Sequence, residues 1–466
     1  MTGLDYMNTV IDFLHAGRQL ETGEISSREL VERCLERIAD PAGEGARTFM
    51  QCHAGAARRA ADETDRLRQA GRTLPLFAGI PFSVKDLFDE AGSVTQAGST
   101  VLADAPAARS DAPAILRLKQ SGMISIGRTT MTEFAFSGVG INPHFDTPAN
   151  PWQRERRHVP GGSSSGAAIS VSDGMACIGI GSDTGGSCRI PAALTGMVGY
   201  KPTARRIPTT HIIPLSTTLD SIGSIAGSVA GCWAADRVMA GHDISMSQLP
   251  DGRQDRQLTL GIMQEEYVMR GADSTVISIW EKTLRRLGKA GVQLVDCFFP
   301  DLDRLPGINA KGGFPAPESL AWHQHLIAAK KEQYDLFVLR RILRGLEQSA
   351  VDYIELIQQR QQMIDRADVM LNEYDAIILP TVPIVAPRMD DLDDDDVYAN
   401  TNLLLLRNAT IVNFLDRCAI SLPCHDEGEA PVGLMIVGKR MHDDALFQIA
   451  AQIEGLLRAG QNGAAA

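Results

Sequence analysis

The amino-acid sequence predicts an α/β fold: a mixed, largely parallel central β-sheet covered by α-helices on both faces. Short apolar runs alternate with amphipathic stretches along most of the chain, and this alternation is typical of the class. Glycine turns separate many of these runs. The chain has 466 residues, of which 44% are hydrophobic and 22% charged, so it can bury a large core.

The N-terminal half supplies the first alternations of helix and strand. Residues 24–39 carry apolar side chains at helical spacing, and Ser26 followed by Glu29 forms a capping box. The apolar run "LFAGIPFSVKDLFD" predicts a buried strand that ends near Lys85. "DAPAILRLKQSGMISIGRT" predicts a helix, a glycine stop and a strand, and residues 164–200 repeat this rhythm.

The C-terminal half continues the pattern around a helical segment. "QLTLGIM", "DSTVISIWEKTLRRLGKAG" and "VQLVD" predict a strand–helix–strand unit. Residues 317–374 are charged and nearly free of glycine and proline. We therefore expect helices from about 300 to 375 that form a layer or cap over the sheet and line a substrate pocket. "YDAIILPTVPIVAP" and "PVGLMIVG" return to the sheet, and "HDDALFQIAAQIEGLL" predicts a closing helix.

Charge and cysteine usage narrow the classes of function. The formal charge of −12 disfavours a nucleic-acid partner, because phosphate contacts rely on lysine and arginine. The first residues lack the pattern of a signal peptide, and no apolar run is long enough to predict a membrane span, so we expect a cytoplasmic protein. The 8 cysteines form no C-x-x-C pair, which favours free buried thiols over a zinc or redox site.

The stretch "HVPGGSSSGAA" raises the question of a serine nucleophile. Residues 162–166 fit G-x-S-x-G, the nucleophile elbow, with Ser164 at the centre. An elbow follows directly on a strand, whereas the preceding "NPWQRERRHVP" is polar and contains two prolines. The context therefore favours a loop and disfavours Ser164 as the nucleophile.

A second glycine turn, residues 181–196, offers a better context. It follows an apolar strand and precedes a helix, so its backbone amides point outward with partial positive charge. Such amides stabilise a developing oxyanion, and Gly185 and Gly186 let the backbone approach a substrate closely. Ser187 lies at this point. A phosphate-binding turn and a purely structural turn remain alternatives.

The base for such a serine is not a histidine in any recognisable context. His158, the histidine closest in sequence to the serines, is more typical of a packing or surface residue. Lys85 ends one of the most apolar strands of the chain. If it is buried there, desolvation lowers its pKa, and a neutral lysine accepts a proton from a serine. A lysine whose ammonium reaches water is the alternative.

Three motifs, "GIPFSVKD", "PGGSSSGAA" and "GSDTGGSCRIPAALTGMVGYKPT", resemble in this order the amidase signature family. Further segments such as "LKQSGMISIGRTTMTEFAFSG", "NPW" and "NFLDRCAISLP" are also similar. The resemblance covers nearly the whole chain, from about residue 24 to 457. It implies a single domain over residues 1–466 with the amidase signature fold.

The resemblance implies a Ser–Ser–Lys triad. Ser187 matches the nucleophile, Ser163 matches the bridging serine, which follows a cis peptide bond in the family, and Lys85 matches the base. Ser164 is then expected beside the triad as a hydrogen-bond partner of the lysine.

The implied activity is that of an amidohydrolase, which cleaves a carboxylic amide through an acyl intermediate on Ser187. Lys85 serves as the base and Ser163 as the proton relay, and neither a metal nor an organic cofactor is needed. The oxyanion hole is implied in the backbone of four consecutive residues: Thr184, Gly185, Gly186 and Ser187. Esters and carbamates are further substrates to test.

Two alternatives remain beside this reading. One is a glutamine-hydrolysing subunit of a tRNA amidotransferase complex, and the other is a non-catalytic scaffold with the same fold. We expect a small-molecule amide as the ligand, near Glu318, His323 and His325, and neither nucleic acid nor membrane as a partner. The sequence does not fix the acyl and amine groups of the substrate or the oligomeric state, for which a homodimer is our expectation.

The chain departs from the family pattern close to the triad. It has Ser165 where the family usually has glycine, and Ala167 where a serine is usual. Cys188 follows the nucleophile where an aliphatic residue is common. We interpret Cys188 as a small core side chain rather than a nucleophile.

Overall fold

A computed structural model describes residues 9–252, 257–371 and 373–462 of the chain. Its strands join in one 11-stranded sheet with the order β1-β3-β2-β4-β6-β5-β10-β11-β9-β7-β8. The strands are β1 Phe49–Cys52, β2 Pro81–Lys85, β3 Ile124–Thr129, β4 Ile178–Ser182, β5 Val198–Lys201, β6 Ile222–Ala226, β7 Thr259–Met263, β8 Gln293–Cys297, β9 Ala376–Pro380, β10 Ala419–Pro423 and β11 Gly433–Val437.

The predicted mixed sheet is confirmed, but it contains fewer parallel pairs than expected. Parallel pairing joins β3-β2-β4 towards one edge and β8-β7-β9 at the other. All pairs from β4 through β6, β5, β10 and β11 to β9 are antiparallel. These middle strands are buried on both faces, so their sequences are as apolar as those of parallel strands. An apolar run therefore identified a strand here without revealing its direction.

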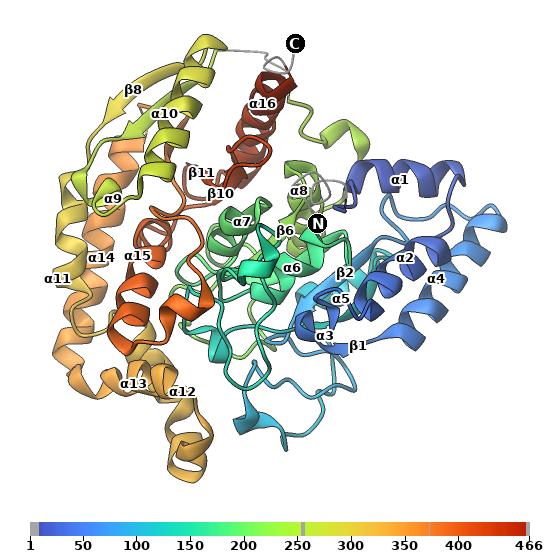
Figure 1. Ribbon diagram of the computed structural model, residues 1–466, viewed down its shortest axis with the longest axis horizontal. Coiled ribbons are helices and arrows are strands. Elements are labelled where there is room, and N and C mark those ends of the chain that lie inside the picture. Colours follow the sequence, from blue (N-terminus) through green and yellow to red (C-terminus); the bar gives the residue numbers. More distant parts are fainter. Residues whose placement is uncertain (1–8, 253–256, 372, 463–466) are drawn as a thin grey trace.

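The helices cover both faces of this sheet, as the sequence predicts (Figure 1). They are α1 Phe13–Thr22, α2 Ser27–Ala39, α3 Gly45–Thr48, α4 Ala54–Gln69, α5 Pro113–Gln120, α6 Ser165–Ser172, α7 Arg189–Thr195, α8 Val229–Ala240, α9 Glu266–Met269, α10 Ser274–Lys289, α11 Leu305–Ile308, α12 Pro315–Lys330, α13 Leu336–Leu343, α14 Ala350–Leu371, α15 Asp395–Phe414 and α16 Asp443–Asn462. The capping box at Ser26 and Glu29 begins α2, as expected.

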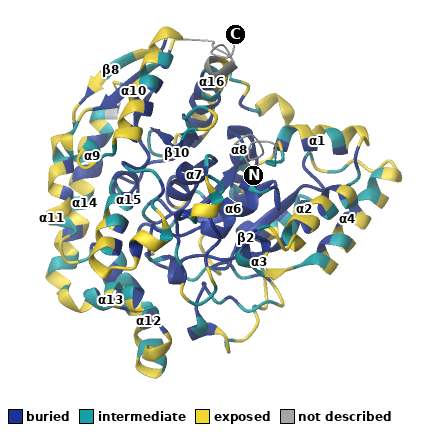
Figure 2. Cartoon of the chain, viewed as in Figure 1, coloured by how far each residue is buried: buried dark blue, intermediate teal, exposed yellow. Residues whose placement is uncertain are grey.

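Successive side chains along a strand point to opposite faces of the sheet. Phe82 and Val84 of β2 belong to the core beneath α5, α8, α10 and α16. Ser83 of β2 points the other way and hydrogen-bonds Ser170 of α6 at 2.7 Å. On this second face Gly179 of β4 brings α6 close, because a Cβ there would lie 2.6 Å from the Ala167 carbonyl oxygen. The central helices α6 and α7 are accordingly buried, whereas the outer helices show exposed sides (Figure 2).

The helical segment predicted at about 300–375 is present as α11 to α14, at the opposite side of the molecule from α1 to α4 (Figure 1). It is interrupted by short 3₁₀ turns at Lys331–Gln333 and Arg344–Glu347. The thiols also follow the prediction, since all eight cysteines are free and only Cys52 is exposed. Among the described residues, none of the helices combines the length and apolar character needed to cross a bilayer.

Candidate active site

Lys85 is the last residue of β2, and its side chain is completely buried. Its Nζ hydrogen-bonds Ser163 Oγ at 2.7 Å and Ser182 Oγ at 2.8 Å. Because β2 and β4 are parallel neighbours, Lys85 and Ser182 reach the same edge of the sheet. Burial lowers the pKa of Lys85 from 10.5 to about 8, against the opposing charge of groups such as Asp183. A substantial fraction of the amine is therefore neutral near physiological pH.

Ser163 follows a cis peptide bond to Gly162, as the resemblance implies. Backbone contacts hold this loop from both sides. The Gly162 N–H donates to the Gly138 carbonyl at 2.8 Å, and the Ser163 carbonyl accepts from the Thr132 N–H at 3.1 Å. The Ser163 side chain is fully buried, so its hydroxyl faces Lys85 rather than solvent.

Ser187 lies in the glycine turn between β4 and α7 and is only 3% exposed. Its carbonyl accepts from the Ser164 N–H at 3.2 Å, which joins the two serine-bearing segments directly. Among the described residues, the Ser187 hydroxyl has no hydrogen-bond partner, and it does not bond the Ser163 hydroxyl. The structure thus brings Lys85 and Ser163 into contact and places the Ser187 segment beside them.

The predicted oxyanion hole needs one correction. The Gly186 N–H already donates to Asp183 Oδ1 at 2.9 Å, so it is not free for a ligand. In the part of the chain that the structure describes, the N–H groups of Thr184, Gly185 and Ser187 donate no hydrogen bond. The positive φ of 121° at Gly186 turns the backbone, and a Cβ there would lie 2.4 Å from Ala409. Gly186 therefore shapes the turn, and its N–H binds Asp183 rather than an oxyanion.

A buried ion pair holds this turn in place. Asp183 and Arg189 pair at 2.8 Å, and both side chains are 0% exposed. Asp183 also accepts from the Cys188 N–H at 3.1 Å, while Asn413 of α15 donates to Asp183 Oδ1 at 2.9 Å. Burial raises the pKa of Asp183, but the Arg189 guanidinium outweighs it and holds this pKa well below its usual range. The carboxylate stays charged and organises the amides around Ser187.

The expectation that Ser164 hydrogen-bonds the lysine is wrong. Its hydroxyl donates instead to the Ser182 carbonyl at 3.3 Å, and Ser182 itself supplies the second hydroxyl at Lys85. The sequence did not predict Ser182 as a site residue, because it is simply the last residue of an apolar strand. The pairing of β2 with β4 places Ser182 beside the end of β2, and this pairing is known only from the structure. Ser164 directly precedes α6 and does not follow a named strand, which disfavours the elbow as the sequence context did.

The departures from the family pattern are all buried. Burial raises the pKa of Cys188 to about 12, which keeps the thiol protonated and supports its interpretation as a core residue. Ser165 Oγ is buried without a hydrogen-bond partner in the structure. Ala167 lies close to β4, since a Cβ at Gly179 would stand 3.0 Å from the Ala167 Cβ.

The helical segment reaches the glycine turn through a chain of polar contacts. Glu318 of α12 accepts from the Ser216 hydroxyl at 2.5 Å and from the Thr218 hydroxyl. Asp220, at the end of the same loop, accepts from the Thr184 hydroxyl at 2.6 Å. Burial raises the pKa of Asp220 to about 6. These contacts connect α12 with the residue that begins the predicted oxyanion hole.

The histidines expected nearby have different environments. His323 is buried among aromatic rings, its Nδ1 lies 2.9 Å from the Tyr334 hydroxyl, and burial lowers its pKa to about 3. His325 is exposed. His158 packs against Trp152, and its Nδ1 lies 2.6 Å from the Ala386 carbonyl oxygen, so it is a packing residue as expected.

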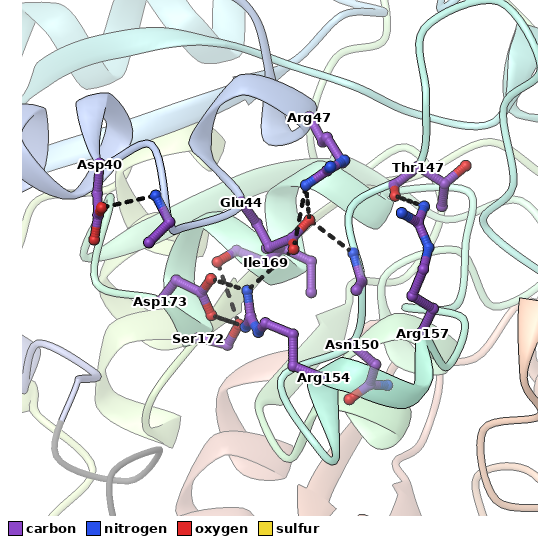
Figure 3. Close-up of polar contacts among 12 residues, drawn as sticks. Asp40, Glu44, Arg47, Thr147, Asn150, Arg154, Arg157, Ile169, Ser172 and Asp173 are labelled. Atoms are coloured by element: carbon purple, nitrogen blue, oxygen red, sulfur yellow. Dashed lines mark hydrogen bonds and ion pairs between the residues drawn. The ribbon is translucent and has the colours of Figure 1, made fainter. Parts of the chain in front are cut away.

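The loop before Ser163 is anchored by charged side chains (Figure 3). Arg154 forms two 2.7 Å contacts with the carboxylate of Asp173, which caps the C-terminus of α6. Glu44 accepts from the Ala149 N–H at 3.0 Å and lies between Arg47 and Arg154. Contacts therefore fix the chain on both sides of the serine run.

Comparison with known proteins identifies the family. The family model described as Amidase matches residues 29–447. The chain belongs to the Amidase family. It is 33% identical over 450 residues to 2-amino-5-chloromuconic acid deaminase of Comamonas testosteroni, covering 96% of each chain. It is 32% identical to a glutamyl-tRNA(Gln) amidotransferase subunit of a Synechococcus strain (WH7803), covering 94% of this chain and 95% of that one.

The fold agrees with this assignment to the Amidase family. The structure is similar to the crystal structure of an amidase with a TM-score of 0.85 and 25% identity, covering 96% of this chain and 99% of the other. The resemblance, the fold class and the activity expected from the sequence are thus confirmed: the chain is an amidase that acts on amide C–N bonds. Within the described residues, no group of three or more histidine, cysteine, aspartate or glutamate side chains could hold a metal ion.

Proposed function

We propose that the chain hydrolyses its amide by acyl transfer to Ser187, with Lys85 as the base and Ser163 as the proton relay. The observation that carries the proposal is the buried Lys85, whose Nζ lies 2.7 Å from Ser163 Oγ. A neutral amine at this distance accepts the hydroxyl proton of Ser163. The alternative of a lysine that reaches water does not fit its complete burial.

Acylation begins when neutral Lys85 takes the proton of Ser163 as Ser163 takes that of Ser187. Rotation of the Ser187 hydroxyl towards Ser163 is required, because the two are not hydrogen-bonded in the structure. Ser187 Oγ then attacks the amide carbon. The amides of Thr184, Gly185 and Ser187 stabilise the oxyanion, and one such donor is typically worth about 3 kcal/mol. Ser163 next protonates the departing nitrogen and recovers its proton from the Lys85 ammonium.

Deacylation repeats the same proton transfers with water in place of Ser187. Lys85 and Ser163 draw a proton from the water, which attacks the ester carbon of the acyl-enzyme. Collapse of the second tetrahedral intermediate breaks the ester bond and returns the proton to Ser187. The products are the carboxylic acid and the free Ser187 hydroxyl, so atoms and protons balance without a cofactor.

The Ser187→Ala variant tests the nucleophile. We expect amide hydrolysis to fall at least about a thousand-fold, because no acyl bond can form. Ser165→Ala is the matched control, since this buried hydroxyl lies in the same site and has no hydrogen-bond partner. Intact-mass analysis after treatment with a fluorophosphonate should show one adduct on the wild-type protein and none on Ser187→Ala. Full activity in Ser187→Ala would reject the proposed role.

The substrate we propose is a small aliphatic or aryl amide that binds beside the helical segment 300–375. The contact between Glu318 and the loop that reaches Thr184 supports this location, because it places α12 near the glycine turn. A panel of amides, esters and carbamates, assayed with wild type and Ser187→Ala, defines the acyl and amine preferences. If substitutions in α12 or α13 leave the substrate preference unchanged, the segment does not line the pocket.

A second candidate function is the glutamine-hydrolysing subunit of a tRNA amidotransferase. It is favoured by the relatives of that name, which match about as much of the chain as the deaminase does. Glutaminase activity that rises when the other subunits of such a complex are added would support it. Hydrolysis of simple amides by the isolated chain, with no response to those subunits, favours the stand-alone amidase. We place either form in the cytoplasm, and we propose a homodimer for the stand-alone form, which sedimentation can test.

A further inference from the structure

We propose that a small cavity beside the start of β10 binds a phosphate group, either as free phosphate or as a small phosphate monoester. The cavity has a volume of about 230 Å³. Its lining residues are Asp368, Arg417, Lys439, Arg440 and His442. None of them takes part in the proposed hydrolysis. The lining comes from three separate parts of the chain: α14, the segment between α15 and β10, and the turn between β11 and α16.

A single carboxylate is shared by two arginines in this cavity. Asp368 pairs with Arg417 through one oxygen and with Arg440 at 3.0 Å through the other. Arg417 is 1% exposed, and its Nε is buried without a hydrogen-bond partner. Burial lowers the pKa of Arg417 despite the presence of Asp368. The buried guanidinium thus keeps an N–H group that none of the described residues accepts.

Lys439, the third cation of the cavity, is not paired with a carboxylate in the described structure. In the described structure, the Lys439 ammonium forms no ion pair or hydrogen bond, although it lines the same cavity. Asp416, a further carboxylate whose charge acts on Arg417, is already paired with Arg205 at 2.5 Å. His442 adds an imidazole that can donate an N–H to an anion.

Charge and size together select the ligand. The three cations and one carboxylate leave a local charge of +2, in a chain whose formal net charge is −12. A phosphate monoester carries about −1.5 to −2 at neutral pH and accepts several hydrogen bonds, which matches this excess. The volume lies below the roughly 300–1,000 Å³ of pockets for drug-sized ligands, so the ligand is small. A single carboxylate would neutralise only half of the excess charge.

The test measures phosphate binding by the full-length protein. Titration calorimetry with inorganic phosphate, against chloride at equal ionic strength, should give one site per chain with a dissociation constant of millimolar or below. The thermal midpoint should rise with phosphate concentration, because a ligand that binds only the folded state stabilises it. Glycerol phosphate in a parallel titration separates the two sources: tighter binding than inorganic phosphate indicates a monoester, and weaker binding indicates free phosphate.

The variant for this site is Lys439→Gln, since the unpaired ammonium can be removed without breaking an ion pair. We expect phosphate affinity to fall at least tenfold, while the thermal midpoint without phosphate stays unchanged. Lys331→Gln, at an exposed lysine between α12 and α13, is the matched control and should bind phosphate as wild type does. No binding by wild type, or equal binding by Lys439→Gln and Lys331→Gln, would overturn the proposal. Amidase activity serves as an independent check that Lys439→Gln is folded.

Discussion

At the scale of single residues, the proposed hydrolysis depends on the environment of the Lys85 amine. The apolar strand β2 carries Lys85 into the interior, where its amine hydrogen-bonds the hydroxyl groups of Ser163 and Ser182. Burial then lowers its pKa to about 8 and makes it a usable base. The next residue along the chain illustrates the precision of the arrangement: Asp86 points away from the site and pairs with Arg128 at 2.8 Å.

The pKa of Lys85 predicts the dependence of activity on pH. Because the neutral amine is the active form, kcat/KM should rise about tenfold per pH unit below pH 8 and level off above it. Initial rates between pH 6 and 10 on a neutral amide substrate measure this profile, with circular dichroism as a check of folding. A profile that falls between pH 7 and 9, with the fold intact, would contradict the assignment of Lys85.

Ser182 is predicted to be a positioning residue for Lys85. Ser182→Ala removes a hydroxyl that holds the Lys85 amine in place, so the plateau of kcat/KM at high pH should fall roughly tenfold. The same hydroxyl accepts from the ammonium and favours it, so the pH inflection should shift to lower pH. Ser165→Ala should change neither, because that hydroxyl has no partner. Rate measurements across the pH range on both variants distinguish the two serines. An unchanged inflection in Ser182→Ala would indicate a role in packing alone.

The sequence predicted the residues of the triad better than it predicted their hydrogen-bond partners. The resemblance placed Lys85, Ser163 and Ser187, and the structure joins the first two directly. It did not reveal Ser182, whose contact with the lysine depends on how β2 pairs with β4. It also counted Gly186 among the oxyanion donors, whereas its N–H is taken by a carboxylate three residues earlier. Both differences concern hydrogen bonds that only tertiary structure specifies.

At the scale of elements, the turn between β4 and α7 is held by charge rather than by apolar packing alone. Asp183 accepts backbone N–H groups of the turn, and Arg189 of α7 fixes Asp183. Arg189 also donates to the Ala409 carbonyl at 3.0 Å, which ties the turn to α15. The orientation of the free amides thus depends on an ion pair between the two ends of one short segment.

This dependence predicts a large effect of Arg189→Met on stability. Removing the guanidinium leaves the Asp183 carboxylate buried and uncompensated, which typically costs about 3–5 kcal/mol. Urea unfolding of wild type and Arg189→Met measures the loss. Arg66→Met breaks an exposed pair with Glu63 and should leave stability unchanged. Equal stability of Arg189→Met and wild type would show that the buried pair does not hold the turn.

At the scale of the whole molecule, one sheet runs through the described chain from β1 to β8. The sequence predicted most of its strands and many of its flanking helices, because apolar runs and amphipathic stretches indicate burial, but it did not predict β1, β6 or β10. It overestimated the share of parallel pairs, because strands covered on both faces carry no mark of their direction. Most strands could therefore be recognised from local sequence, whereas their order and direction could not.

A continuous sheet predicts that the chain unfolds as one unit, in keeping with the single domain expected from the sequence. We expect one transition in urea, with coincident midpoints by far-ultraviolet circular dichroism and by fluorescence of the four tryptophans. Trp322 lies in the helical segment and the other three lie outside it, so the fluorescence reports both parts. Two separated transitions would show that the segment 300–375 folds independently.

The contact between Arg154 and Asp173 bears on how the protein tolerates insertions in the loop before the bridging serine. It closes a non-covalent ring around the bridging serine, with the preceding loop on one side and the end of α6 on the other. We therefore expect an insertion upstream of residue 154 to lengthen the surface loop and to leave the position of the bridging serine unchanged.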